Sequence, residues 1–200
     1  MTRTIGIFVF NDVEVLDFAG PYEVFTCATR VGDKLTPGGV APFRVRTIGA
    51  SLAPLRARAG LAVHPEADFA SAGKIDVLII PGGVVTAELA KPEVIAWIGA
   101  MAPDCELVAS VCTGAFLLAQ AGLLDGQDAT THWDDIADLR TAYPQVRVRT
   151  DRRWIDNGRV ITSGGISAGI DMSLHLVERL AGRELALGTA RQMEYDWNEA

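Results

Sequence analysis

Three nearly continuous apolar runs, separated by segments with helical spacing, restrict this chain to a small group of folds. The runs cover residues 5–10, 75–80 and 107–111. A strand that is apolar along its whole length must be covered on both faces, and such strands are usually parallel. Parallel neighbours need long crossover connections, which are usually helices. The pattern therefore predicts an α/β fold, a three-layer sandwich with a mainly parallel central sheet.

The segments with helical spacing supply the expected crossovers. We place these helices at residues 21–31, 92–101, 113–121 and 166–180. Pro21 follows Gly20 and suits the first position of a helix, and Glu23 stands where a capping carboxylate would reach back. The first helix is therefore predicted to begin at Pro21.

The remaining segments indicate loops and edge strands. Residues 32–42 have the composition of a surface loop, whereas residues 43–48, 61–63 and 146–149 alternate as half-exposed strands do. Asn157-Gly158, between two strand-like runs, predicts a β-hairpin. Because there is neither an internal repeat nor a second apolar unit, residues 1–200 are predicted to form one domain.

Composition and charge exclude several classes of protein. Hydrophobic residues make up 49% of the 200 residues, and the net charge is −7. Such a chain can build a full core, and its charge disfavours a nucleic-acid partner. No apolar run approaches the ~20 residues of a membrane span, and the first residues lack the features of a secretory signal, so we expect a cytoplasmic protein without membrane contact. The segment after residue 180 is too short for a helix-turn-helix module.

One cysteine lies where an apolar strand passes directly into an apolar helix. Cys112 follows the run 107–111, and Gly114 lets the backbone pass closely, as in a nucleophile elbow. A helix start favours a thiolate, so we expect a lowered thiol pKa. The alternative is a buried structural cysteine, the role that we expect for Cys27 and Cys105. Three cysteines without a secretion signal do not predict a disulfide framework.

Two further segments offer partners for this thiol. Pro81-Gly82-Gly83 ends a buried strand and could present backbone N–H donors to an anion, although it could equally be a plain turn. Asp17 stands between Leu16 and Phe18, and apolar company with a nearby thiolate would raise its pKa. The alternative for Asp17 is capping of its own backbone before a helix, and the sequence leaves both interpretations open.

Residues around one histidine could complete the same crevice. His132 opens a helix after a short strand, and Gly165 with Ile166 follows another buried strand. No histidine has the spacing of a metal ligand, and the acidic pairs Asp134-Asp135 and Asp12 with Glu14 are interpreted as solvated surface, so no metal is predicted. Nucleotide-binding glycine motifs are also absent.

Taken together, these segments resemble the DJ-1/PfpI superfamily. The motifs are Leu-Asp-x-x-Gly-Pro at 16–21, Pro-Gly-Gly at 81–83, Val-Cys-Thr-Gly at 111–114, Thr-Thr-His-Trp at 130–133 and Gly-Gly-Ile-Ser-Ala-Gly-Ile-Asp at 164–171. They are similar to the branch that contains isonitrile hydratase and the amidase-like domains of AraC-type regulators. The resemblance implies a flavodoxin-like fold, a homodimer and no cofactor.

The resemblance also implies roles for single residues. Cys112 would be the nucleophile, Asp17 its acid/base partner, Thr113 a source of a backbone N–H and a hydroxyl, and Gly83 a further backbone donor. His132, with Gly165 and Ile166, would border the pocket.

Two departures narrow the expected activity. Hydrolytic PfpI members have histidine after the cysteine, whereas Thr113 stands here, which argues against a peptidase. DJ-1-like proteins carry glutamate where this chain has Asp17. The expectation is a lyase that hydrates a small isonitrile to an N-substituted formamide. The alternatives are a regulatory sensor domain without catalysis and a DJ-1-like stress-response or glyoxalase protein.

Overall fold

The central sheet has seven strands, and all neighbouring strands except the pair at one edge run parallel. The computed structural model describes residues 1–199 and gives the order β10-β11-β7-β6-β1-β2-β5. The antiparallel pair is β10 with β11. The strands of this sheet are β1 (Arg3–Phe8), β2 (Phe43–Gly49), β5 (Ala67–Asp68), β6 (Val77–Ile80), β7 (Leu107–Val111), β10 (Trp154–Asp156) and β11 (Val160–Ser163).

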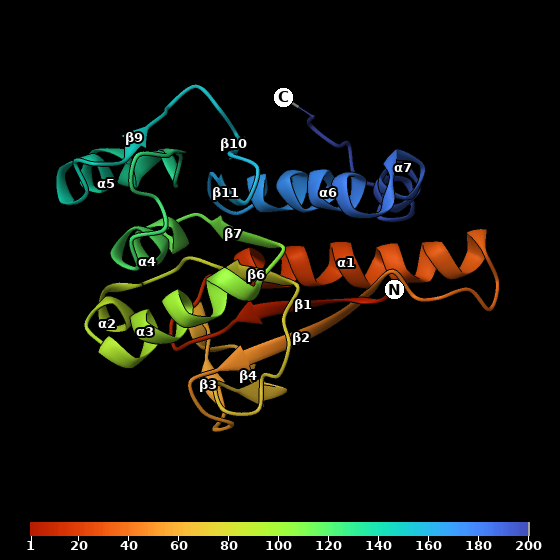
Figure 1. The fold of residues 1–200 in the computed structure, drawn as a ribbon, viewed down its shortest axis with the longest axis horizontal. Helices are drawn as coiled ribbons and strands as arrows, with labels where there is room; N and C mark the ends of the chain where they lie inside the picture. The colour runs from red at the N-terminus through yellow and green to blue at the C-terminus, as the bar shows by residue number, and fades with distance from the viewer. Residues whose placement is uncertain (200) are drawn as a thin grey trace.

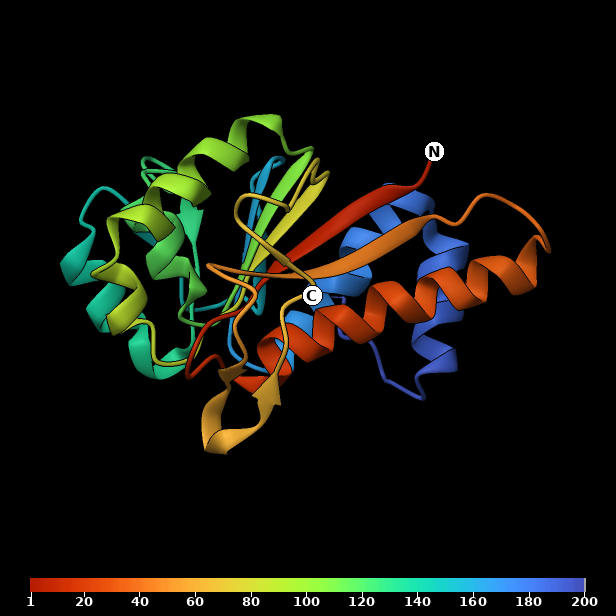
Figure 2. The same ribbon diagram turned by 90° about the horizontal axis from the view of Figure 1, so that it is seen from below.

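Helices cover both faces of the sheet, which confirms the predicted flavodoxin-like sandwich. Figure 2 shows α1, α6 and α7 on one side and α2 to α5 on the other. Their bounds are α1 (Val15–Leu35), α2 (Thr86–Leu89), α3 (Pro92–Met101), α4 (Gly114–Gln120), α5 (Ile136–Ala142), α6 (Ala168–Ala181) and α7 (Arg183–Gln192). In Figure 1 the long helix α1 lies directly against α6 and α7.

Short strand pairs and 3₁₀ turns lie outside the central sheet. Two-stranded pairs are formed by β3 (Leu55–Arg56) with β4 (Ala62–Val63), and by β8 (Asp128–Ala129) with β9 (Arg147–Val148). Short 3₁₀ turns lie at η1 (Arg58–Gly60), η2 (Ala102–Asp104) and η3 (Trp133–Asp135). Within residues 1–199, no helix combines the length and the apolarity needed to cross a membrane.

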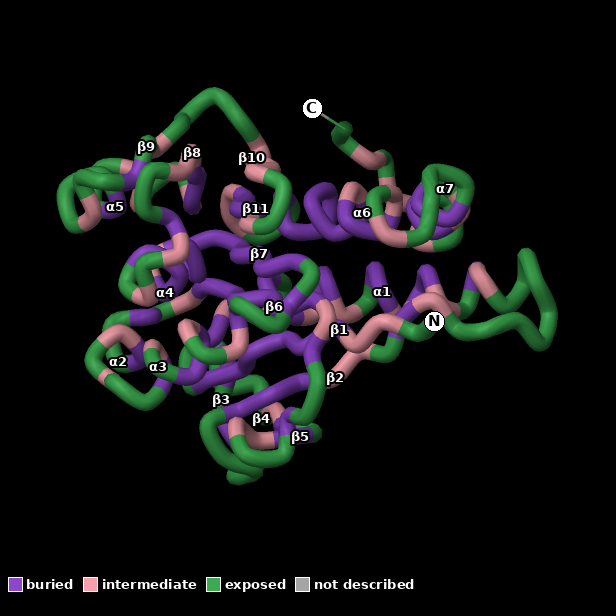
Figure 3. The backbone as a smooth tube through the Cα atoms, in the orientation of Figure 1, coloured by how far each residue is buried: buried purple, intermediate pink, exposed green. Residues whose placement is uncertain are grey.

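The core sits between the sheet and its helical layers, as the buried segments in Figure 3 show. Every residue of β6 and β7 is buried, and so are the last four residues of β1. Because each fully buried Leu or Ile contributes about 1.5–3 kcal/mol relative to exposure, these central strands contribute strongly to the stability of the fold. Their carboxyl ends form the edge that carries the candidate site.

The first helix begins earlier than its sequence predicts. It starts at Val15, whose N–H donates to the Glu14 side chain (3.2 Å), so that Pro21 lies inside the helix. The local preference of proline for a helix start is overridden because Asp17 and Phe18 are buried against the core. The helix also continues to Leu35, which shortens the loop expected at 32–42. The hairpin around Asn157-Gly158 is confirmed as β10 and β11.

Candidate active site

Cys112 occupies the sharp turn between β7 and α4, as expected of a nucleophile elbow. Its φ is 58°, an unusual conformation for a residue with a side chain. The turn is held in place because its N–H donates to Ser163 O and Gly164 O, and its carbonyl accepts from the Thr131 hydroxyl. A Cβ at Gly114 would lie 2.1 Å from a backbone oxygen of β6, so only glycine fits there.

Asp17 is fully buried and connects three distant segments at this elbow. Its Oδ2 accepts from the Gly82 N–H and its Oδ1 from the Ile166 N–H, both at 3.1 Å. The Cys112 thiol is its neighbour, and each of the two groups affects the pKa of the other. Burial raises the pKa of Asp17 from 3.8 to about 6, against the opposing effect of these hydrogen bonds. Both carboxyl oxygens of Asp17 therefore accept hydrogen bonds from distant segments of the site, and not from the backbone at the start of α1.

The pKa of the Cys112 thiol is raised rather than lowered, which corrects the expectation of a thiolate at a helix start. Burial, followed by the charge of Asp17, raises the pKa of Cys112 to about 12. The side chain is only 7% exposed, and the following helix α4 has just seven residues. Desolvation and a neighbouring carboxylate thus outweigh the helix terminus. Attack by sulfur requires a proton acceptor, and Asp17 is the neighbouring carboxyl group.

The hydroxyl of Thr113 is hydrogen-bonded to the Gly82-Gly83 turn. Its hydroxyl donates to Gly83 O and accepts from the Gly83 N–H, both at 2.9 Å. The Gly82 N–H is already used by Asp17. A Cβ at Gly82 would lie 2.5 Å from Thr113 Oγ1 and 2.9 Å from Cys112 Cβ, so glycine permits this close approach. Both N–H groups of the turn are therefore engaged by side chains of the site.

A cavity of about 260 Å³ opens beside the sulfur. It is lined by Glu14, Arg58, Gly83, Cys112, Thr113, His132, Asp134, Asp135 and Ile166. His132 is held by Asp135, with 3.2 Å between Nδ1 and Oδ2. A Cβ at Gly165 would lie 2.4 Å from His132 Cδ2 and 3.4 Å from Cys112 Sγ. The structure thus brings the imidazole and the Gly165-Ile166 turn next to the thiol, as the sequence suggests.

Four charged residues at this cavity do not follow from the sequence interpretation. Glu14, Asp134 and Asp135 are predicted as solvated surface; Asp134 is exposed as predicted, Glu14 and Asp135 are half-buried, and all three line the cavity. The adjacency of Asp134 and Asp135 to His132 was the available signal. Arg58 gives no signal in the sequence; the turn η1 between β3 and β4 carries it to the site, where Nη1 lies 3.4 Å from Glu14 Oε2. Among residues 1–199 no group of three or more metal-ligating side chains is assembled.

The other two cysteines lie away from this cavity. Cys105 precedes β7, at the opposite end of the strand from Cys112, and its thiol donates to Met101 O (3.3 Å). Burial raises its pKa to about 11. Cys27 is buried in α1, and burial raises its pKa as well. Both fit the structural roles expected of them.

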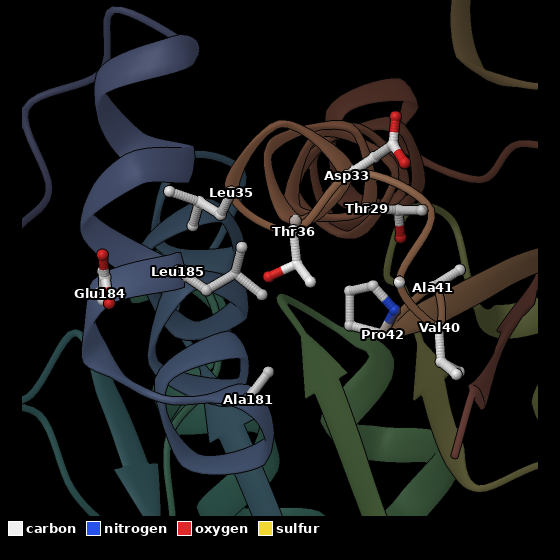
Figure 4. Close-up of a pocket in the computed structure, with 12 residues that line it drawn as sticks. Thr29, Asp33, Leu35, Thr36, Val40, Ala41, Pro42, Ala181, Glu184 and Leu185 are labelled. Atoms are coloured by element: carbon white, nitrogen blue, oxygen red, sulfur yellow. The ribbon is translucent and has the colours of Figure 1, made fainter.

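A larger cavity, of about 510 Å³, lies at the far end of α1. It is enclosed by α1, the loop before β2 and the start of α7, as Figure 4 shows. Its charged side chains are Asp33 on α1 and Glu184 on α7, and its apolar wall includes Leu35 and Leu185. It contains no cysteine and no histidine, so the nucleophile chemistry belongs to the smaller cavity.

Known proteins match almost the whole chain. Residues 3–179 match the model of the DJ-1/PfpI family. Isonitrile hydratase from Pseudomonas putida is 34% identical over 98% of this chain and 79% of its own length. The transcriptional regulator GbdR from Pseudomonas aeruginosa is 31% identical over 97% of the chain, which spans only 51% of that regulator. A ThiJ/PfpI family protein from Pseudomonas syringae superposes with a TM-score of 0.85 at 27% identity, over 99% of this chain and 77% of that one.

Proposed function

The chain belongs to the DJ-1/PfpI family, and on that premise we propose that it is a cysteine-dependent hydratase that adds water to an isonitrile. The product is an N-substituted formamide. The observation that carries the proposal is the pairing of a buried thiol, on a strained elbow, with a fully buried carboxyl group. Cys112 supplies the nucleophile and Asp17 moves the proton.

The first step adds the thiol across the terminal carbon of the isonitrile. The Cys112 S–H bond breaks as sulfur attacks that carbon, and the proton passes to the Asp17 carboxylate. The protonated Asp17 then delivers this proton to the same carbon. The result is a thioimidate in which the carbon carries sulfur, one hydrogen and the nitrogen of the substrate. No oxidant, metal or cofactor is needed, because the isonitrile carbon accepts both groups.

The second step is hydrolysis of this thioimidate. Asp17, ionised again, takes a proton from a water molecule as the water oxygen attacks the carbon, and it passes this proton to the substrate nitrogen. Collapse of the adduct forms the carbonyl and breaks the carbon–sulfur bond, and Asp17 carries the proton of the adduct hydroxyl to sulfur. The formamide leaves, and Cys112 is a thiol once more.

The hydrogen bonds of the Gly-Gly turn favour an isonitrile over an amide. Attack on an amide places negative charge on oxygen, which needs free N–H donors. Here the Gly82 N–H is bonded to Asp17 and the Gly83 N–H to Thr113. Attack on an isonitrile creates no oxyanion. The contribution of Gly83 to the site is therefore its pair of hydrogen bonds with the Thr113 hydroxyl.

Replacing the nucleophile tests this proposal. We expect Cys112→Ser to reduce formamide production from a small alkyl isonitrile at least ~1000-fold, because an alcohol is a far weaker nucleophile than a thiol. Cys105→Ala, a change in the same strand region but outside the cavity, is the matched control and should retain activity. Full hydration by Cys112→Ser would contradict the proposal.

A regulatory sensor domain is the second candidate, because the match to GbdR covers 97% of the chain. A sensor would bind isonitriles or related molecules without forming formamide. Calorimetric titration alongside the activity assay separates the two functions. Stress protection through oxidation of the thiol is disfavoured, because reactivity with peroxide follows thiolate character and the pKa of Cys112 is raised. The homodimer and the cytoplasmic location stay predictions, which light scattering and cell fractionation test.

A further inference from the structure

We propose that the Cys112 cavity selects substrates whose non-reacting end carries a positive charge, such as a protonated amine, and disfavours anionic ones. The reacting group is taken from the proposed function, and the charge preference deepens it. The inference comes from the walls of the cavity, which hold more charge than a site for an alkyl isonitrile requires.

Negative charge dominates these walls. Three carboxylates, on Glu14, Asp134 and Asp135, face a single guanidinium, on Arg58. Arg58 is committed to Glu14, with 3.4 Å between the two groups. Asp135 is paired with the imidazole of His132. A cation entering the cavity is therefore attracted, and an anion is repelled.

Asp134 is the carboxylate best placed to bind the substrate. It is exposed at the cavity wall, and no ion pair within residues 1–199 engages it. An exposed carboxylate at the wall of the cavity attracts an ammonium group by Coulomb interaction.

The size of the cavity limits the rest of the substrate. Its volume of about 260 Å³ is below the ~300–1,000 Å³ of pockets for drug-sized ligands. A short chain between the reacting carbon and the ammonium group satisfies both limits. The inferred substrate class is a small aminoalkyl isonitrile.

Charged thiol reagents test the charge preference without any isonitrile. The rates of Cys112 modification by 2-ammonioethyl and 2-sulfonatoethyl methanethiosulfonate are compared, and their ratio is divided by the ratio for free 2-mercaptoethanol. Cys112→Ala supplies the background from the other cysteines. Because both reagents consume the same thiolate, the raised pKa of the thiol cancels from the ratio. We expect a normalised ratio well above one that falls towards one in ~1 M salt.

Single charge neutralisations locate the effect. Asp134→Asn should lower the normalised ratio about fivefold, the size expected for one water-screened charge acting in opposite directions on the two reagents. Asp33→Asn removes an equal charge from the exposed far end of α1, outside this cavity, and should leave the ratio unchanged. A ratio equal to that of 2-mercaptoethanol, equal effects of both variants, or no modification of Cys112 would overturn the inference.

Isonitriles carrying an ammonium or a carboxylate group of equal length complete the test. A higher kcat/KM for the ammonium compound, lost in Asp134→Asn, supports the inference. Hydration of both compounds at equal rates contradicts it but leaves the hydratase intact. Absence of turnover with every isonitrile overturns the proposed function, and the thiosulfonate ratio then decides separately whether the cavity selects cations.

Discussion

Replacing Asp17 with asparagine should change how the stability of the fold depends on pH. Burial raises the pKa of this carboxyl from 3.8 to about 6 in the folded protein. A carboxyl whose pKa is raised by folding stabilises the native state fully only below its unfolded pKa. That contribution is lost as the pH rises through the folded value. The amide side chain of the Asp17→Asn variant cannot ionise, so the variant lacks this loss.

The expected magnitude follows from the shift. About two pKa units correspond to about 3 kcal/mol, of which about 2 kcal/mol is lost between about pH 4.5 and about pH 7.5. The amide of asparagine offers one oxygen where the carboxylate offers two, so one of the N–H donors from Gly82 and Ile166 loses its acceptor. That loss costs about 1–3 kcal/mol at either pH.

Urea unfolding, followed by tryptophan fluorescence at the two pH values, measures the difference. Between the lower and the higher pH, the free energy of unfolding of the wild type should fall by about 2 kcal/mol more than that of Asp17→Asn. Asp33→Asn, at the exposed far end of the same helix, is the matched control and should follow the wild type. Identical pH dependence in wild type and Asp17→Asn would refute the buried, raised-pKa carboxyl.

Three further predictions concern the residues around the sulfur. Gly165→Ala should reduce activity at least ~10-fold and lower the free energy of unfolding by about 1–3 kcal/mol, because its Cβ would lie 2.4 Å from His132. The control Gly164→Ala makes only ordinary 3.5 Å contacts and should have a small effect on both quantities. Kinetics and urea unfolding of the two variants measure the difference. Thr113→Val should lower the free energy of unfolding by about 1–3 kcal/mol, because Gly83 loses both hydrogen bonds to the hydroxyl, and Thr113→Ser should retain most of that stability. A valine variant as stable as the wild type in urea would contradict these hydrogen bonds. The rate kcat/KM should rise with pH through about 6 as Asp17 ionises and becomes a proton acceptor; a flat profile from about pH 5 to 8 would exclude that role.

The sequence predicts those parts of the fold where local pattern and tertiary environment agree. The strand 107–111 and the helix 92–101 have the predicted bounds, because their apolar residues are buried as their spacing implies. The start of α1 does not agree. Pro21 is a local signal for a helix start, but burial of Asp17 and Phe18 extends the helix back to Val15.

The same distinction applies to the candidate site. The elbow at Cys112 follows from a buried strand that passes directly into a helix, whereas a role for Asp17 beside it was implied only by the family resemblance. The sequence predicts the wrong direction for the pKa of the Cys112 thiol, because a helix start can be read from the sequence but the depth of burial cannot. Arg58 reaches the cavity on a turn between two short strands, and no periodicity fixes where such a turn packs.

The most direct test of the central claim is mass spectrometry of the protein quenched with acid during turnover of a small isonitrile. The account predicts an adduct with the full mass of the substrate on the peptide that contains Cys112, absent in Cys112→Ser and decaying to formamide and free thiol. Formamide production with no adduct on that peptide at any time, or an adduct on Cys27 or Cys105 instead, would contradict a covalent mechanism at the elbow.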